Sequence, residues 1–431
     1  MTTSGDKVAQ PEPRLREVAG FRLFATARVV AWLGHALSLV ALPILAYQRT
    51  GSATLTGLLA AAESLPYLIL GLVIGAYVDR HDGRRILAVA TAFSGVASLT
   101  VPAAAAAGLL TVAQPLVVAF VVGVAFVFGD AAYFGVLPRL VGRERVGAAT
   151  ASLSAAYTVI GIGMPGLAGV LVPFIGAPAV IGVDGALTVT AAAMLTAVPR
   201  RAPEPGSDSE SGEPRRLWRD VGEGLAYIWR HPVVRPLTLL GFGNSFTGGA
   251  VAGLVVVMAV ERLGLPDDDG RIGLLYAASA LGAFVGSLLL GRLQRRLPVG
   301  RLTLTGFTAT TLLVVAWGTT TNWVLGLATL FALDLVDSIV VLNGIVVRQS
   351  ITPMRLQGRV NTTARVIAWG GAPLGAAVGG AIAGAWRIDA ALYICAAAVG
   401  LALVAGLLSG VARLGMLADL IREAHGPDRS D

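Results

Sequence analysis

The chain has 431 residues, of which 55% are hydrophobic and only 14% charged, and its formal net charge is +7. Soluble proteins carry about 25% charged residues, so this composition indicates a protein that lies in a lipid bilayer. The basic residues fall in alternate loops rather than on one contiguous face, which argues against a nucleic-acid-binding protein.

Twelve apolar stretches are long enough to cross a membrane, for which a helix needs about 20 residues. Their approximate bounds are 21–46, 53–78, 86–109, 114–137, 147–173, 176–198, 233–261, 271–293, 300–318, 322–346, 359–383 and 387–411. The stretches predict an all-α membrane protein with twelve transmembrane helices.

One long polar segment, residues 199–230, interrupts a series of otherwise short links. It begins with PRRAPEPGSDSESGEPRR, which is typical of a flexible linker. It then places Leu217, Val221, Leu225 and Ile228 at helical spacing, which predicts an amphipathic helix on the inner membrane surface. We therefore divide the chain into an N-terminal tail, a six-helix bundle, a cytoplasmic linker, a second six-helix bundle and a C-terminal tail, at 1–20, 21–198, 199–232, 233–411 and 412–431.

The basic residues indicate how the bundles are oriented. If both termini are cytoplasmic, as an even number of helices allows, the only Lys or Arg residues at outer helix ends are Arg49, Arg262, Arg271 and Arg387. Arg28 lies within the first helix, and the others lie at inner ends, inner loops and tails. The positive-inside rule therefore predicts a cytoplasmic membrane protein with both termini in the cytoplasm.

The sixth and twelfth helices have similar sequences. The segment VDGALTVTAAA begins at Val183 and IDAALYICAAA begins at Ile388, so that Asp184 aligns with Asp389. The match is either a trace of two related, pseudo-symmetric halves or a coincidence of alanine-rich composition. Related halves are typical of secondary transporters, whose substrate site lies between them near the midplane. We interpret the two aspartates as contacts at outer helix ends rather than as coupling residues.

A charged loop, GAYVDRHDGRR, connects the second and third helices. Its charges cannot lie in hydrocarbon, so the loop forms a polar turn on one membrane face. The loop resembles the signature loop of the major facilitator superfamily. Its Asp-Arg-x-Asp variant is similar to the branch that contains enterobactin exporters and macrolide or multidrug efflux proteins. The matching residues, around an extra residue at His81-Asp82, are Gly75, Asp79, Arg80, Gly83, Arg84 and Arg85.

The resemblance implies a gate on the cytoplasmic side. Asp79 would lie near the inner end of helix 11, and Arg80 or Arg84 would reach a carboxylate on helix 4. These contacts would hold the two bundles together when the carrier faces outward. The alternative is an ordinary positive-inside loop with no such role.

Small residues and prolines mark candidate hinges in two helices. Helix 5 contains Gly163, Pro165 and Gly166, and helix 11 contains Pro373 among several glycines. The helix 5 segment includes a GxGxxG pattern, but no predicted strand precedes it, which argues against a dinucleotide site. The segment either allows close helix packing or forms the export-specific hinge that the resemblance implies.

Ionisable residues within helices mark functional sites by default, because charges there are costly. A carboxylate near the midplane, such as Glu63 or Asp334, is desolvated and can bind and release a proton near neutral pH. A purely structural role is the alternative for Glu63 and for His35. The candidates for proton coupling are Arg28, His35, Glu63, Asp130 and Asp334.

Asp130 has two sets of candidate partners. At 1.5 Å per residue, Arg28 lies about 10 Å from the inner end of helix 1, and Asp130 lies at a similar depth in helix 4. The two residues can therefore form a pair. Alternatively, Asp130 is the latch partner of Arg80 or Arg84.

Aromatic and polar side chains are candidates for lining a substrate cavity. Most of them lie in helices 1, 4, 7 and 10, which line the cavity in the resembled superfamily. The alternative for the aromatic residues is that they only pack against other helices. These candidates are Trp32, Tyr133, Phe134, Phe242, Asn244, Phe246, Asp337 and Trp369.

Together the patterns predict a secondary active transporter. The sequence contains no Walker loop, nucleophile–base pair or metal-ligand cluster, so we expect no enzymatic activity, no cofactor and no metal site. We expect proton-coupled efflux of a hydrophobic or amphiphilic small molecule, such as a drug, antibiotic, siderophore or natural product, by alternating access. The alternatives are import or uniport of a small metabolite, and translocation of a lipid or lysolipid. The expected partners are the substrate, protons and the bilayer, without nucleic acid, and the expected state is a monomer.

Overall fold

A computed structural model describes residues 18, 20–78, 81–199 and 217–425. These residues contain no strand, and they form twelve helical spans that are long and apolar enough to cross a membrane. The expected all-α fold with twelve transmembrane helices is confirmed.

The spans occur in chain order with one short helix between the sixth and the seventh. The first six are α1 (Phe21–Thr50), α2 (Ala53–Val78), α3 (Gly83–Ala106), α4 (Ala113–Val141), α5 (Val146–Ile175) and α6 (Ala177–Ala197). The other six are α8 (Val234–Glu261), α9 (Arg271–Arg296), α10 (Val299–Thr319), α11 (Trp323–Ile351), the consecutive pair α12 (Met354–Trp369) and α13 (Gly371–Ala385), and α14 (Ile388–Leu408). The short helices are α7 (Leu217–Arg230) and α15 (Leu417–His425), with 3₁₀ turns at Arg143–Arg145 and Val411–Arg413.

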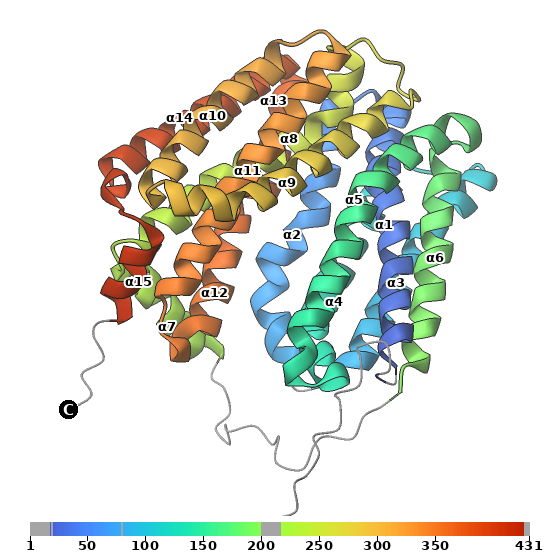
Figure 1. Cartoon of the computed structure of the whole chain (residues 1–431). Coiled ribbons are helices and arrows are strands. Elements are labelled where there is room, and N and C mark those ends of the chain that lie inside the picture. The colour runs from blue at the N-terminus through green and yellow to red at the C-terminus, as the bar shows by residue number, and fades with distance from the viewer. Residues whose placement is uncertain (1–17, 19, 79–80, 200–216, 426–431) are drawn as a thin grey trace, which may run out of the picture.

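The spans form two neighbouring groups, which we call the N-terminal half (α1–α6) and the C-terminal half (α8–α14) (Figure 1). In the N-terminal half α1 and α3 pack on α6, and α2 packs on α4. In the C-terminal half α9 packs on α11, α8 on α13 and α10 on α14. We name the side of the bundle at which α6 ends and α8 begins the linker side, and the opposite side the far side.

The two halves touch most closely toward the far side. There α2 packs on α13 and α8, and α5 packs on α9. A Cβ atom on Gly57 would lie 2.5 Å from the carbonyl oxygen of Ala376, and one on Gly169 would lie 2.5 Å from that of Gly270. Only glycine permits such approaches, because larger residues would separate the helix backbones. Small residues therefore allow the helices of the two halves to pack closely at the far side, and we call these contacts the far-side seal.

The eleventh span is interrupted, whereas the sequence predicts one continuous helix over 359–383. It begins earlier, at Met354, and changes from α12 to α13 at Gly370. Pro373 has no backbone N–H, so it cannot bond to the carbonyl of Trp369 one turn earlier. The Ser245 hydroxyl on α8 donates to that carbonyl over 3.4 Å. A neighbouring helix thus satisfies the group that proline leaves free.

Two amphipathic helices cover the linker side of the C-terminal half. Ile228 of α7 and Leu420 of α15 are buried in one cluster with Val234, Val347 and Ile351 from the spans. The sequence predicts the first of these helices. The second lies in the expected C-terminal tail, where the sequence analysis predicts no helix. Its apolar residues recur at helical spacing, which was the available signal.

Candidate functional site

An ion pair joins the two halves near the middle of the bundle. Arg365 on α12 donates through Nη2 to Asp130 Oδ2 on α4, over 2.5 Å. Each residue lies eleven positions from the linker-side end of its helix, or about 16 Å at 1.5 Å per residue. Their side chains are 30% and 26% exposed. The pair therefore connects the halves at a depth where an unpaired charge is costly.

Aromatic rings from both halves surround Arg365. Its guanidinium lies 4.9 Å from the ring centre of Tyr67 on α2 and 4.8 Å from that of Trp369 on α12. The two rings are 5.4 Å apart. Cation–π attraction of this kind contributes about 0.5–2 kcal/mol. Arg365 therefore retains favourable contacts even when its carboxylate partner is removed.

The observed partner of Asp130 differs from those predicted. Arg28 lies over the rings of Trp32, at 4.8 Å, and Tyr133, at 5.5 Å, and it acts on Asp130 electrostatically. The direct bond to Asp130 comes instead from Arg365, which the sequence analysis did not single out. It was nevertheless visible as a basic residue within the eleventh predicted helix.

The described residues of the charged loop bond within the N-terminal half. Arg84, expected to reach helix 4, donates instead to the carbonyl oxygen of Val198 at the end of α6. Asp82 caps α3 by accepting hydrogen bonds from the backbone N–H groups of Arg84 and Arg85. A capping carboxylate at a helix N-terminus is favourable. Asp79 and Arg80 lie outside the described residues, so a latch through them stays a prediction.

Gly75 and Gly83 of the same motif lie in α2 and at the start of α3. A Cβ atom on Gly75 would meet no neighbour within 4 Å, whereas one on Gly83 would lie 3.3 Å from Val136 on α4. Close helix packing therefore explains Gly83 but not Gly75.

A second pair of candidates meets between α1 and α2. His35 Nε2 lies 3.9 Å from Glu63 Oε1. Glu63 also acts electrostatically on Tyr276 of α9 in the other half. His35 and Glu63, which the sequence analysis treats separately, thus form one titratable pair near the contact between the halves.

Asp184 is not a helix-end contact, contrary to our interpretation of the sequence. Its side chain is 4% exposed. It accepts hydrogen bonds from Ser38 on α1 at 2.6 Å, Ser98 on α3 at 2.9 Å and Thr188 on α6 at 3.0 Å. The carboxylate therefore joins three helices of the N-terminal half.

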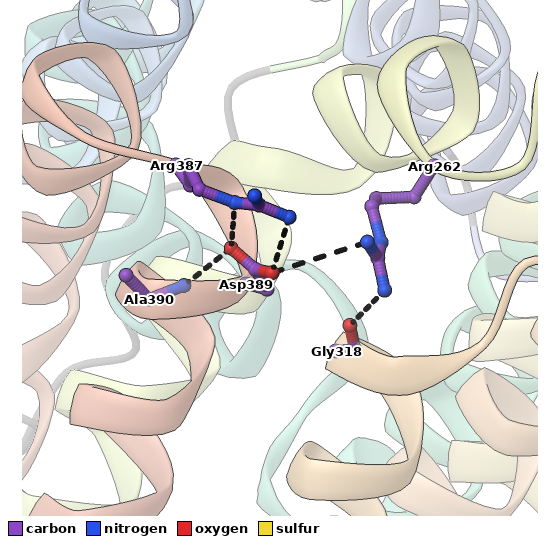
Figure 2. Close-up of polar contacts among 5 residues, drawn as sticks. All are labelled: Arg262, Gly318, Arg387, Asp389 and Ala390. Atoms are coloured by element: carbon purple, nitrogen blue, oxygen red, sulfur yellow. Dashed lines mark hydrogen bonds and ion pairs between the residues drawn. The ribbon is translucent and has the colours of Figure 1, made fainter.

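The aligned residue Asp389 does lie at a helix end, as Figure 2 shows. It pairs with Arg387 at 3.0 Å and accepts a hydrogen bond from the backbone N–H of Ala390. Arg262 approaches it to 3.9 Å and donates to the carbonyl of Gly318 (Figure 2). Aligned aspartates thus have different roles in the two halves.

Three further candidates share a cavity inside the C-terminal half. Asp334 and Asp337 on α11 and Asn244 on α8 line it, and Asn244 Nδ2 donates to Asp337 Oδ1 over 2.5 Å. All lining residues come from α8, α9, α10 and α11. The cavity is therefore separate from the Asp130–Arg365 pair.

The aromatic candidates occupy different environments. Phe134 is 62% exposed and Trp369 is 41% exposed. The backbone carbonyls of Phe242 and Phe246 lie against Gly371 and Gly375 of α13, so this part of α8 packs closely on its neighbour. Phe134 and Trp369 are the better candidates for contact with a bound molecule, since their surfaces are free.

Only one of the two candidate hinges coincides with a helix interruption. Pro373 lies just after the junction of α12 and α13, whereas α5 runs continuously through Gly163, Pro165 and Gly166. In α5 the closest approach to the other half is at Gly169. The hinge interpretation therefore favours Pro373.

Comparisons with known proteins agree with this architecture. The sequence model of the Major Facilitator Superfamily matches residues 24–364. The multidrug efflux pump Tap of Mycobacterium tuberculosis is 30% identical over 230 residues, which cover 51% of this chain and 52% of Tap. The enterobactin exporter EntS of Citrobacter koseri is 26% identical over 356 residues, 80% of this chain and 81% of EntS. The resemblance to efflux proteins and enterobactin exporters is thus confirmed.

A solved structure shows the same fold. It is that of a bacterial homologue of the human lysosomal transporter Spinster, in an inward-facing and unoccupied conformation. The TM-score is 0.69 at 17% identity, with 96% of each chain covered. At this identity the match supports the fold alone.

Proposed function

The chain belongs to the Major Facilitator Superfamily and is a multi-pass membrane transporter, and from this premise we propose that it exports hydrophobic or amphiphilic small molecules in exchange for protons. Similarity to Tap and EntS supports export. We further propose that it acts as a monomer in the cytoplasmic membrane, with two six-helix bundles and both termini in the cytoplasm.

The Asp130–Arg365 ion pair is the observation that carries this proposal. It bonds the two halves at mid-depth, so a movement that separates α4 from α12 must break it. Breaking it with both groups charged leaves two unpaired charges in a medium of low dielectric constant, at a cost of several kcal/mol. A proton on Asp130 removes one of these charges. Tyr67 and Trp369 continue to stabilise the other.

This arrangement can couple proton movement to alternating access. In the state described here Arg365 bonds to Asp130. A movement that separates α4 from α12 removes that partner, and in our proposal the carboxylate then takes up a proton. A group whose protonation differs between two conformations links proton binding to their equilibrium. The groups that face Asp130 are Arg365 and Tyr67 from one side and Arg28 and Tyr133 from the other.

The close contacts at the far side indicate which side of the membrane the conformation described here is open to. If the linker side is cytoplasmic, as the positive-inside rule predicts, the far-side seal at Gly57 and Gly169 makes this the inward-facing state. Substrate would then enter from the cytoplasm or the inner leaflet. The exposed rings of Phe134 and Trp369 offer apolar surface. The Nε atoms of Arg28 and Arg365 are buried without a described hydrogen-bond partner, so we expect substrates to carry a hydrogen-bond acceptor.

The proposal is tested with purified protein in proteoliposomes and a panel of amphiphilic antibiotics and siderophores. A pH gradient imposed in either direction should drive at least one compound against its own gradient, in the direction opposite to proton flow. Accumulation in the direction of proton flow would indicate an importer. Lipid movement that is independent of the gradient would indicate a lipid translocator.

A further inference from the structure

A cavity lies inside the C-terminal half, lined by α8, α9, α10 and α11, and a few polar side chains interrupt its mostly apolar lining. Its volume is about 90 Å³. Asp334 and Asp337 line it from one face of α11, because residues three apart lie on the same side of a helix. Asn244 and Thr310 line it from α8 and α10, with Ser279 on α9. Oxygen-bearing side chains thus converge from four helices.

The cavity contains two carboxyl groups and no basic side chain among its described lining residues. Asn244 satisfies one oxygen of Asp337 through its amide N–H. Asp334 and Asp337 act on each other electrostatically. An ionised carboxylate without a positive partner is strongly disfavoured in the bilayer. The cavity therefore lacks compensating positive charge.

Two buried acceptor oxygens in the cavity also lack partners. Asn244 is 1% exposed and Thr310 is 3% exposed. The Asn244 amide nitrogen donates to Asp337, so the Oδ1 atom of Asn244 is available to accept a further contact. No described residue forms a hydrogen bond with this Oδ1 atom or with Thr310 Oγ1. Buried polar atoms are nearly always satisfied, and an exception calls for an explanation. What these two oxygens and both carboxylates share is the capacity to bind a cation.

We propose that this cavity binds a hard metal cation through oxygen ligands, supplied by Asp334, Asp337, Asn244 and Thr310. Carboxylate, amide and hydroxyl oxygens suit cations such as Na⁺ and Ca²⁺ rather than thiophilic metals. The described residues contain no group of three or more His, Cys, Asp or Glu side chains that could hold a metal ion, so a site here uses amide and hydroxyl oxygens beside its two carboxylates. One Ca²⁺ ion neutralises the negative charges of both carboxylates. One Na⁺ ion neutralises them if one carboxylate also carries a proton. Either ion supplies the missing positive charge, contrary to the absence of a metal site expected from the sequence.

The site borders the contact between the two halves. Glu63 of α2 acts electrostatically on Tyr276, another lining residue. A bound cation would fix α8 relative to α11, and α8 packs against α2. The cation would therefore stabilise one arrangement of the halves. This role goes beyond the proposed proton exchange at Asp130 and does not depend on it.

The experiment measures cation binding to the purified full-length protein in detergent. Thermal unfolding is followed while NaCl or CaCl₂ replaces choline chloride at constant ionic strength, and binding is measured directly with ²²Na⁺ and ⁴⁵Ca²⁺. A ligand that binds the folded state raises the unfolding temperature with its concentration. We expect saturable binding of one of these ions, with a chelator separating the Ca²⁺ arm from the Na⁺ arm.

The variants locate the site. Asp334→Asn and Asp337→Asn should each weaken binding by about tenfold or more, and Thr310→Val, which keeps the side-chain shape, should weaken it less. Asp389→Asn, which alters a carboxylate at a helix end outside the cavity lining, should leave the affinity unchanged. The proposal is wrong if neither isotope binds saturably to the wild type, or if Asp334→Asn, Asp337→Asn and Thr310→Val all bind as the wild type does. These binding measurements use no proton gradient, so their failure would leave the proposed proton-coupled export untouched.

Discussion

Asp130 and Arg365 are 235 positions apart in the sequence, yet their side chains form one ion pair that joins the two halves about midway through the bundle. Arg365 also lies against two aromatic rings, one from each half. The pair therefore connects the two halves directly, and it leads to the first prediction.

Substituting Asp130 or Arg365 should destabilise the protein, because either substitution removes the ion pair between them. We expect a double-mutant cycle of Asp130→Asn and Arg365→Gln to give a coupling energy of about 0.5–3 kcal/mol, because the groups are in direct contact. Thermal unfolding in detergent near neutral pH measures it. Asp389→Asn paired with Arg365→Gln is the control and should give additive effects. Additivity of the Asp130 and Arg365 substitutions would show that the pair does not exist in solution.

Asp184→Asn should destabilise the N-terminal half. Ser38 and Ser98 both donate to Oδ2 of Asp184, and Thr188 donates to Oδ1. The amide nitrogen of asparagine is a hydrogen-bond donor, so whichever oxygen it replaces, at least one of these hydroxyl groups loses its acceptor. Leaving a buried hydroxyl unpaired costs about 1–3 kcal/mol. Asp389→Asn, at the aligned position in the other half, should leave the unfolding temperature nearly unchanged. Equal effects of the two substitutions would contradict the different roles assigned to them.

Acidification should loosen the junction between α7 and α8. His231 Nδ1 accepts hydrogen bonds from the backbone N–H groups of Val233 and Val234, and burial lowers the pKa of His231 below its usual 6.5. The neutral form therefore stabilises the folded state above pH 6.5, and this contribution is lost as pH falls through the lowered pKa. Arg230 and Arg235 line the same groove, and the Tyr227 ring lies nearby. Protonation there also places a third positive charge at a helix N-terminus, which is unfavourable.

Hydrogen exchange of the backbone amides of His231, Val233, Val234 and Arg235 reports on this junction. Their protection should fall between about pH 7.5 and pH 5. In His231→Asn, whose amide oxygen can still accept the hydrogen bonds, protection should be independent of pH over this range. A wild-type junction with the same protection at both pH values would refute the proposed role of His231.

Pro373→Ala should restrict movement of the eleventh span. Alanine restores the N–H that can bond to the carbonyl of Trp369, so α12 and α13 should join into a straighter helix. We expect higher thermal stability and slower transport in proteoliposomes. Pro165→Ala in the continuous helix α5 is the matched control and should change the transport rate much less. If Pro165→Ala slows transport as strongly, the interruption at Gly370 is not the moving part.

The fold was predictable from the sequence because each transmembrane helix satisfies its own backbone hydrogen bonds. Length and hydropathy therefore identify the spans without knowledge of their neighbours. The interruption after Trp369 was partly visible in Pro373 and the glycines beside it. Its observed form also depends on Ser245, which belongs to another helix.

Side-chain partners were less predictable, because they depend on which helices become neighbours. Depth along the helices pointed to Arg28 as a partner of Asp130, but Arg365 also lies at a suitable depth in the eleventh span and forms the observed bond. The similar segments around Asp184 and Asp389 gave no indication that only Asp184 meets hydroxyl groups from two other helices. Local sequence determined the helix, and packing between helices determined the role of each carboxylate.

We propose that during transport Asp130 alternates between a state bonded to Arg365 and a protonated state. The most direct measurement compares wild type with Asp130→Asn in proteoliposomes, using one exported compound and an imposed pH gradient. Wild type should accumulate the compound against its gradient. Asp130→Asn, which cannot exchange a proton at this position, should move the compound only down its gradient, while Asp389→Asn behaves as wild type. Undiminished gradient-driven accumulation by Asp130→Asn would show that Asp130 is not the proton-coupling group.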